Sequence, residues 1–178
     1  MHRSQWIALA ASVAVGVIWT FNIQKWLLLA IFPGLLLGQG MQLQTFINGS
    51  STPAFAVLWA GCLSALLIWI VTTLTARPKS SSQVREKQPQ WWLAAISLVV
   101  FGWLCMTWYT VLYWTFTSTS PTQIPGMHYY PVPPQGWAVL LLLVIVDVTL
   151  LFWLPTLLAS PRTYRFVVPG AVTLLGSR

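Results

Sequence analysis

Four apolar runs, each of about 20 residues or more, dominate this chain. About 20 residues at a rise of 1.5 Å each cross the roughly 30 Å hydrocarbon core of a bilayer. Because that core offers no water to backbone N–H and C=O groups, each run is expected to be an α-helix. Only 6% of the residues are charged, too few to enclose four such runs in a soluble protein. The sequence predicts an all-α, polytopic integral membrane protein with four transmembrane helices.

A strongly polar segment midway along the chain groups the predicted helices into two tandem hairpins. Residues 77–90 hold four of the nine Lys and Arg residues, and we expect this segment to be a water-exposed connector. The predicted helices run from Gln5 to about Phe32, Pro53 to about Ala76, Trp91 to about Phe116, and Trp137 to about Ala159. Pro155 is expected to bend or loosen the end of the fourth helix. The predicted organisation is a first hairpin over 1–76, the connector over 77–90, a second hairpin over 91–159 and a basic, partly apolar tail over 160–178.

The distribution of basic residues predicts the orientation of the helices. Eight of the nine fall on the face that holds both termini and the connector, and only Lys25 lies toward the opposite face. This imbalance indicates cytoplasmic termini, or stromal termini in a photosynthetic membrane, so a bacterial plasma membrane or a thylakoid membrane is expected. The net charge of +7 would suggest nucleic acid in a soluble protein, but membrane topology accounts for it, and lipids rather than nucleic acid are the expected surroundings. The eight residues are Arg3, Arg77, Lys79, Arg85, Lys87, Arg162, Arg165 and Arg178.

The two predicted hairpins resemble each other, which favours an internal duplication. Shifting the chain by 82 to 85 residues aligns several positions of the first hairpin with the second. The longest match sets 73–79 beside 156–162, where both read T-L-x-A-x-P followed by a basic residue. A repeat of two helices keeps its orientation, so the result would be a parallel repeat. The alternative is chance similarity between apolar segments.

Asp147 is the only acidic residue inside a predicted span, and such a residue is by default a functional-site hypothesis. Three interpretations are open: hydrogen bonds to Thr, Ser or Trp of a neighbouring helix, a proton or ion pathway, and contact with a ligand or partner. Lys25, the one intramembrane cation, is a candidate partner for its carboxylate. We favour a structural role facing the protein interior, because proton pumps and transporters usually carry several such residues.

Few residues in this chain could build an active site. Two acidic residues and two histidines leave little for general acid–base catalysis, and the common hydrolase, nucleotide and zinc motifs are missing. Cys62 and Cys105 lie singly within spans and are expected to pack as small apolar residues. His128 could ligate a metal or a chlorophyll magnesium, but no Cys, Asp or Glu lies near it in sequence. We therefore expect neither enzyme activity nor a metal site.

Small residues at helical spacing predict places where helices approach closely. The pairs are Ser12-xxx-Gly16 in the first span and Gly61-xxx-Ala65 in the second. Small side chains let the backbones of membrane helices come together. Chance spacing is the alternative, because small residues are common in spans.

Aromatic residues make up 14% of the chain, and several lie in the middle of the spans rather than at their ends. They could pack flat against the rings of chlorophyll, a quinone or another apolar cofactor. Ordinary packing inside the helix bundle is the alternative. The mid-span tryptophans are Trp59, Trp69 and Trp103.

The two loops opposite the connector, residues 34–52 and 117–136, hold no charge and many apolar side chains. Large exposed apolar patches mark interaction sites, so these loops are the expected partner surface; the alternative is that they fold down and cap the helix ends. The favoured function is a non-enzymatic accessory subunit or assembly factor of a larger membrane complex, photosynthetic or respiratory. The alternatives are a pigment- or other apolar-cofactor-binding protein, and a transporter or channel component that uses Asp147. The candidate partner contacts are Met41, Phe46, His128, Tyr129 and Tyr130.

Overall fold

The computed structural model describes residues 3–31, 47–48, 52–75, 81–117, 134–164 and 166–171. Over these ranges the chain is helical apart from short turns, as the sequence predicts for an all-α protein. Four of the helices in this part of the chain are long and apolar enough to cross a membrane. They cover Leu9–Ala30, Thr52–Thr75, Ser82–Tyr109 and Pro134–Ala159.

Two of the four spans are continuous helices, and two contain a single wider turn. The first span consists of α1 (Arg3–Ile18), the π-helical turn η1 (Trp19–Ile23) and α2 (Gln24–Ala30). The second span is α5 (Thr52–Thr75), and the third is α7 (Lys87–Thr117), preceded by the short helix α6 (Ser81–Arg85). The fourth span consists of α8 (Pro134–Val148), the π-helical turn η3 (Thr149–Trp153) and α9 (Leu154–Ala159), followed by the 3-10 turn η4 (Arg162–Tyr164).

Prolines in the first turns explain where three of these helices begin. Pro53 is the second residue of α5, Pro89 the third of α7 and Pro134 the first of α8. The first N–H groups of a helix have no partner within the helix, so proline loses nothing there. The helices α7 and α8 therefore start earlier than the predicted Trp91 and Trp137, at Lys87 and Pro134.

The predicted loosening at Pro155 takes the form of the π turn η3. The N–H of Leu154 donates to the carbonyl of Thr149, five residues back, instead of four. Pro155 follows directly and has no N–H with which to continue an α-helical ladder. The wider turn therefore lies where the hydrogen-bond pattern must shift.

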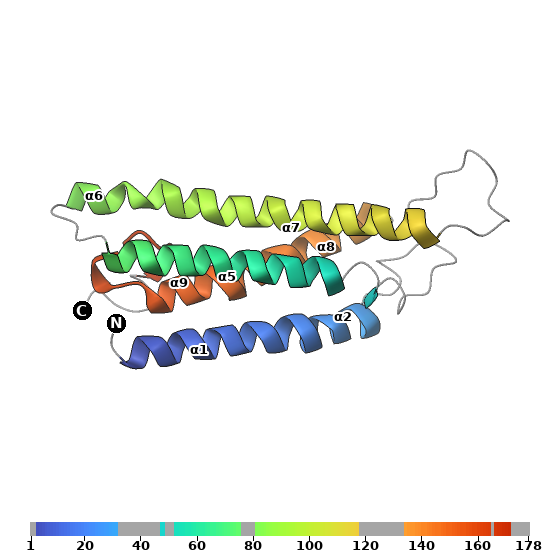
Figure 1. The fold of residues 1–178 in the computed structure, drawn as a ribbon, viewed down its shortest axis with the longest axis horizontal. Coiled ribbons are helices and arrows are strands. Elements are labelled where there is room, and N and C mark those ends of the chain that lie inside the picture. The colour runs from blue at the N-terminus through green and yellow to red at the C-terminus, as the bar shows by residue number, and fades with distance from the viewer. Residues whose placement is uncertain are drawn as a thin grey trace.

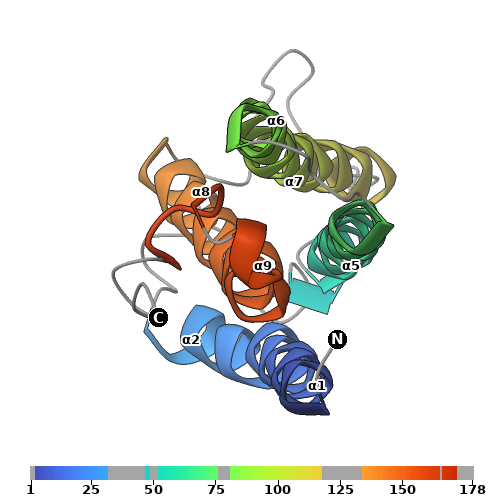
Figure 2. The same ribbon diagram turned by 90° about the vertical axis from the view of Figure 1, so that its left-hand side faces the viewer.

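The four spans run alternately up and down, so the start of α1, the end of α5, α6 and α9 gather at one end of the bundle (Figure 1). We call this end the α6 end. The second and fourth spans form the central pair, because α5 packs against η3 and α9. The first span lies on one side of this pair, against α9 and η3, and α7 lies on the other, against α5 and α8 (Figure 2).

Glycines mark the closest approaches between spans. A Cβ placed on Gly16 would collide with the side chain of Leu151 in the fourth span. A Cβ on Gly102 of α7 would lie 2.8 Å from Val144 Cγ1 and 2.9 Å from Leu58 Cδ1. Membrane helices gain little from burying apolar groups away from lipid, so close van der Waals packing of this kind holds them together.

Candidate functional site

Asp147 lies in the middle of the fourth span and is buried, with a side chain 1% exposed. Its Oδ1 accepts a hydrogen bond of 2.7 Å from Trp19 Nε1, and its Oδ2 accepts one of 3.0 Å from Gln24 Nε2. Both donors belong to the first span. The carboxyl group therefore ties the first span to the fourth inside the bundle, and we call these three residues the Asp147 junction.

The π turn η1 explains how two residues five positions apart reach one carboxyl group. In an α-helix each residue turns about 100°, so Trp19 and Gln24 would point about 140° apart. In η1 the N–H of Gln24 donates to the carbonyl of Trp19, an i to i−5 bond. This wider turn brings positions i and i+5 toward the same face. Single π turns are rare and occur often at functional sites.

Three buried polar side-chain atoms among the described residues make no hydrogen bond: Thr20 Oγ1, Gln24 Oε1 and Trp59 Nε1. Thr20 and Gln24 belong to the same stretch of the first span as the junction. Trp59 of α5 packs edge-on against Phe21, with ring centroids 6.3 Å apart. Because Gln24 Oε1 has no hydrogen-bond partner, the Gln24 amide could be flipped and accept a hydrogen bond if residue 147 carried a donor in place of a carboxylate.

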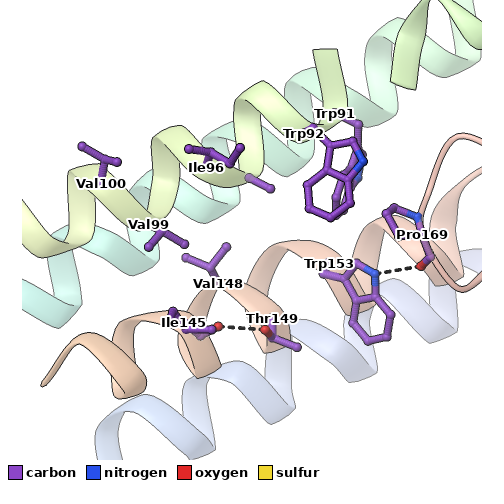
Figure 3. A pocket seen from close by; sticks show the side chains of 11 residues that line it. Trp91, Trp92, Ile96, Val99, Val100, Ile145, Val148, Thr149, Trp153 and Pro169 are labelled. Atoms are coloured by element: carbon purple, nitrogen blue, oxygen red, sulfur yellow. Dashed lines mark hydrogen bonds between the residues drawn. The ribbon is translucent and has the colours of Figure 1, made fainter. Parts of the chain in front are cut away.

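A second feature is an apolar groove of about 480 Å³ on the side of the bundle, between α7 and the fourth span (Figure 3). The third and fourth spans pack through α7 and α8, and the groove follows η3 toward the α6 end. Figure 3 shows the side chains of α7 facing those of the fourth span across it. The lining residues are Trp91, Trp92, Ala95, Ile96, Val99, Val100, Ile145, Val148, Thr149, Trp153 and Pro169.

Tryptophans fix the α6 end of this groove. Trp91 is buried and stacks on Phe152 of the fourth span, with centroids 5.6 Å apart and planes 26° apart. Its Nε1 donates to Thr156 Oγ1 at 3.1 Å. Trp153 Nε1 donates to the carbonyl of Pro169 at 2.9 Å, which holds the tail against the fourth span. Trp92 is 47% exposed at the mouth of the groove.

Nearly every polar group in the groove wall is already engaged, so its surface is apolar. The hydroxyl of Thr149 donates to the carbonyl of Ile145 at 2.7 Å within its own helix. The indoles of Trp91 and Trp153 are bonded as described above. Ile96 and Val100 on α7 and Ile145 on α8 are exposed along the rim. The groove can therefore take an apolar chain or ring from the side.

The residues singled out from the sequence have different positions in the structure. Asp147 faces the interior and is hydrogen-bonded, and one of its partners is a tryptophan of a neighbouring helix, as the structural interpretation expects. Lys25 is not that partner, because its Nζ donates to Asn48 Oδ1 at 3.2 Å near the end of the first span. The junction instead uses Gln24, the residue before Lys25.

The small residues chosen from sequence are mostly packing sites. Gly16 meets Leu151 of the fourth span, and a Cβ on Gly61 would lie 3.2 Å from Phe101 of α7. Ala65 is half-buried and packs against the core. The backbone of Ser12 belongs to α1, and its side chain lies outside the described set, as do the candidate partner contacts Met41, Phe46, His128, Tyr129 and Tyr130.

Sequence reasoning missed Gln24, Gly102 and Trp91. Gln24 is a polar residue on the same apolar run as Lys25, so its unfavourable position in a span could have identified it. Gly102 stands alone in α7 without a small residue four positions away, and the small-xxx-small pattern passes over it. Trp91 reads as an interfacial tryptophan, but its ring turns inward.

Among the residues that the structure describes, no group of three or more His, Cys, Asp or Glu side chains could hold a metal ion. Cys62 and Cys105 are free cysteines.

Comparison with known proteins gives no match: no family model fits the chain, and no curated protein or solved structure is significantly similar to it.

Proposed function

We propose that this protein is a non-enzymatic accessory subunit or assembly factor that associates in the plane of the membrane with a larger integral membrane complex, photosynthetic or respiratory. One observation carries the proposal: the intramembrane carboxyl group is used inside the bundle. Both oxygens of Asp147 are bonded to side chains of the first span. The carboxyl group of Asp147 therefore serves to hold the first and fourth spans together.

The outward faces of the described spans support the same proposal. They carry large apolar side chains, among them Leu67 and Ile68 on α5, Leu93 on α7 and Leu142 on α8. Such a surface recognises other molecules by shape and apolar contact rather than by charge. A transporter component would be expected to expose its carboxyl group to a water-filled path, whereas Asp147 is enclosed.

The experiment is co-purification of the tagged full-length protein from its native membrane. Replacing Tyr129 and Tyr130 with Ser should release the partner complex and leave the thermal stability of the isolated protein nearly unchanged, if the uncharged loops form the partner surface. Leu67→Ala with Ile68→Ala on the outward face of α5 is the comparison variant: release of the partner by this variant and not by the tyrosine variant would put the contact on the spans. If the tyrosine variant unfolds the isolated protein, the loops are a cap; if co-purification is untouched, the loops are not the contact.

A common origin of the two hairpins is part of this proposal, and the packing order supports it. The first span packs mainly on the fourth, and the third mainly on the second, around the central pair. A two-fold axis along the membrane normal, between the second and fourth spans, would exchange these two contacts. Homologous sequences should then show the same internal offset of 82 to 85 residues; an offset that shifts between homologues would contradict it.

A second candidate function, the binding of an apolar molecule, is favoured by the groove. Its volume of about 480 Å³ lies within the usual range for small-molecule sites. Chlorophyll, another pigment or a quinone could occupy it. An absorption spectrum of the gently purified protein tests for a coloured occupant, and extraction with organic solvent followed by mass spectrometry tests for a colourless one.

A further inference from the structure

The groove between α7 and the fourth span has a length and a charge pattern that narrow the choice of occupant. We propose that it holds one acyl chain of an anionic phospholipid from the leaflet at the α6 end, with the headgroup beside Arg85 and Lys87. This inference rests on the second candidate function, the binding of an apolar molecule, and names its chemical class.

The length of the groove matches one leaflet. On α7 its lining runs from Trp91 to Val100 and on the fourth span from Trp153 to Ile145. At 1.5 Å per residue these stretches measure about 14 Å and about 12 Å. Half of a hydrocarbon core of roughly 30 Å is about 15 Å. A single lipid chain that starts at the α6 end therefore fills the groove and ends near the bilayer centre.

The walls suit a chain that enters from the side. Ile96, Val100 and Ile145 are exposed along the rim, so the occupant stays in contact with the surrounding lipid. The polar groups of Trp91, Trp153 and Thr149 are bonded within the protein. A pigment or quinone ring usually needs a donor or ligand directed at it. Apart from the indole N–H of Trp92 at the mouth, the side-chain donors of the described lining are already bonded.

Charge at the mouth selects the headgroup. Lys87 lies four residues before Trp91 within α7, so the two share a helix face. Arg85 is the last residue of α6, at the same end of the bundle. The short helix α6 ends with the bond from the N–H of Glu86 to the carbonyl of Ser82 at 3.1 Å, and α7 continues in the same direction from Lys87 (Figure 1). Lys87 Nζ donates a hydrogen bond of 3.0 Å to Oε1 of Gln90, which is the residue before Trp91. Glu86 is the one acidic residue within residues 77–90.

Trp92 marks the depth at which the acyl chain of the bound lipid meets its headgroup. Its ring is half exposed at the mouth, and tryptophan prefers the level where headgroups meet acyl chains. The cations Arg85 and Lys87 lie on the outer side of this level, and the apolar wall lies on the inner side. This order, from cation to indole to apolar groove, is the order of phosphate, glycerol and acyl chain in a lipid.

The test is native mass spectrometry of the purified full-length protein, titrated with phosphatidylglycerol and with phosphatidylcholine of the same chains. Binding of phosphatidylglycerol should be about fivefold or more tighter, the effect of roughly one cation near a lipid surface. Arg85→Gln with Lys87→Gln should remove most of this preference. Arg3→Gln is the matched control, because it removes a charge at the same end but on the first span.

Filling the groove tests where the chain binds. Ala95→Phe should lower binding of both lipids at least tenfold, whereas Ala60→Phe on the exposed face of α5 should not. Melting of each variant shows whether it folds. Should Ala95→Phe fail to fold, lipids brominated on the acyl chain give a second test: they should quench wild-type fluorescence more than that of Trp92→Phe.

The outcomes separate this inference from the function on which it rests. Equal binding of the two lipids, blocked by Ala95→Phe, would overturn the anionic class but keep a groove for an apolar molecule. Recovery of a pigment or quinone from the native protein would also overturn the proposal that a lipid chain occupies the groove. Binding that Ala95→Phe leaves unchanged would show that the lipid binds outside the groove and would overturn this inference. The binding of another apolar molecule would then depend on what is recovered from the native protein.

Discussion

Gln24 of the first span and Asp147 of the fourth, 123 positions apart in sequence, are joined by a hydrogen bond of 3.0 Å between Nε2 and Oδ2. Trp19 donates to the other oxygen of the same carboxyl group at 2.7 Å. In a membrane interior neither donor can turn to water when its acceptor is removed. The hydrogen bonds between the side chains of the first and fourth spans at this point therefore all depend on Asp147.

Replacing Asp147 with Ala should destabilise the protein by about 1 to 3 kcal/mol, since two interhelical hydrogen bonds are lost and the buried Gln24 and partly buried Trp19 donors are left without acceptors. The measurement is the unfolding of the purified protein in increasing denaturing detergent. Asp147→Asn should cost less, because the Gln24 amide can turn over and present Oε1 to the new NH2 group while Trp19 keeps its acceptor. Equal losses for the two variants would contradict this account.

The close contact between Gly16 and Leu151 gives a second prediction. Gly16→Ala places a methyl group against the Leu151 side chain, and overpacking of this kind typically costs about 1 to 3 kcal/mol. Leu151→Ala in the same chain should recover part of that loss, although alone it removes buried contacts. Gly61→Ala is the matched control, because its new Cβ would meet Phe101 at the milder distance of 3.2 Å. Additive losses in the Gly16–Leu151 pair would mean that the two residues do not compete for space.

The sequence was sufficient to predict the spans because their lengths and composition follow directly from the bilayer. All four predicted spans correspond to helices in the structure, with starts differing by a few residues where prolines fit a first turn. Gly16 and Gly61 were predictable as contact sites by their size. The partners of these glycines, Leu151 and Phe101, were not, because helix spacing alone does not say which span lies opposite.

The Asp147 junction shows why the site was only partly predictable. Burial of an acid in a span forces it to find donors, so an interior, hydrogen-bonded Asp147 follows from the sequence. The identity of the donors depends on the π turn η1, which turns Gln24 to the side of Trp19. Nothing in the order Trp19 to Ile23 signals such a turn. The groove likewise depends on how the third and fourth spans are placed relative to each other, which composition does not encode.

Topology gives a third prediction. The connector should face the cytoplasm, because eight of the nine basic residues lie on that side of the predicted spans. Single cysteines at Ser81 and Ser118, in a chain with Cys62 and Cys105 replaced by Ala, should react with membrane-impermeant reagents from opposite sides. Reaction of both from one side would rule out the four-span arrangement in the membrane.

The contact of Trp91 with the fourth span gives the last prediction, in which stacking and hydrogen bonding can be separated. Trp91→Phe keeps a ring on Phe152 but loses the bond to Thr156. Interhelical hydrogen bonds in membranes are worth about 0.6 kcal/mol on average, and the Thr156 hydroxyl retains its bond to the carbonyl of Trp153. Loss of this hydrogen bond in Trp91→Phe should therefore lower the free energy of unfolding by about 1 kcal/mol or less, in addition to the loss caused by the smaller ring.

Trp91→Ala should cost about 3 to 5 kcal/mol, the usual loss when a buried aromatic side chain is deleted, because both the stacking on Phe152 and the wall of the groove disappear. Thr156→Val removes the hydroxyl at nearly constant volume and completes a double-mutant cycle with Trp91→Phe. The coupling measured by detergent unfolding should be near the value for one membrane hydrogen bond. If the coupling instead approaches the full loss seen for Trp91→Ala, then the hydrogen bond, and not the stacked rings, holds the third span to the fourth at the α6 end.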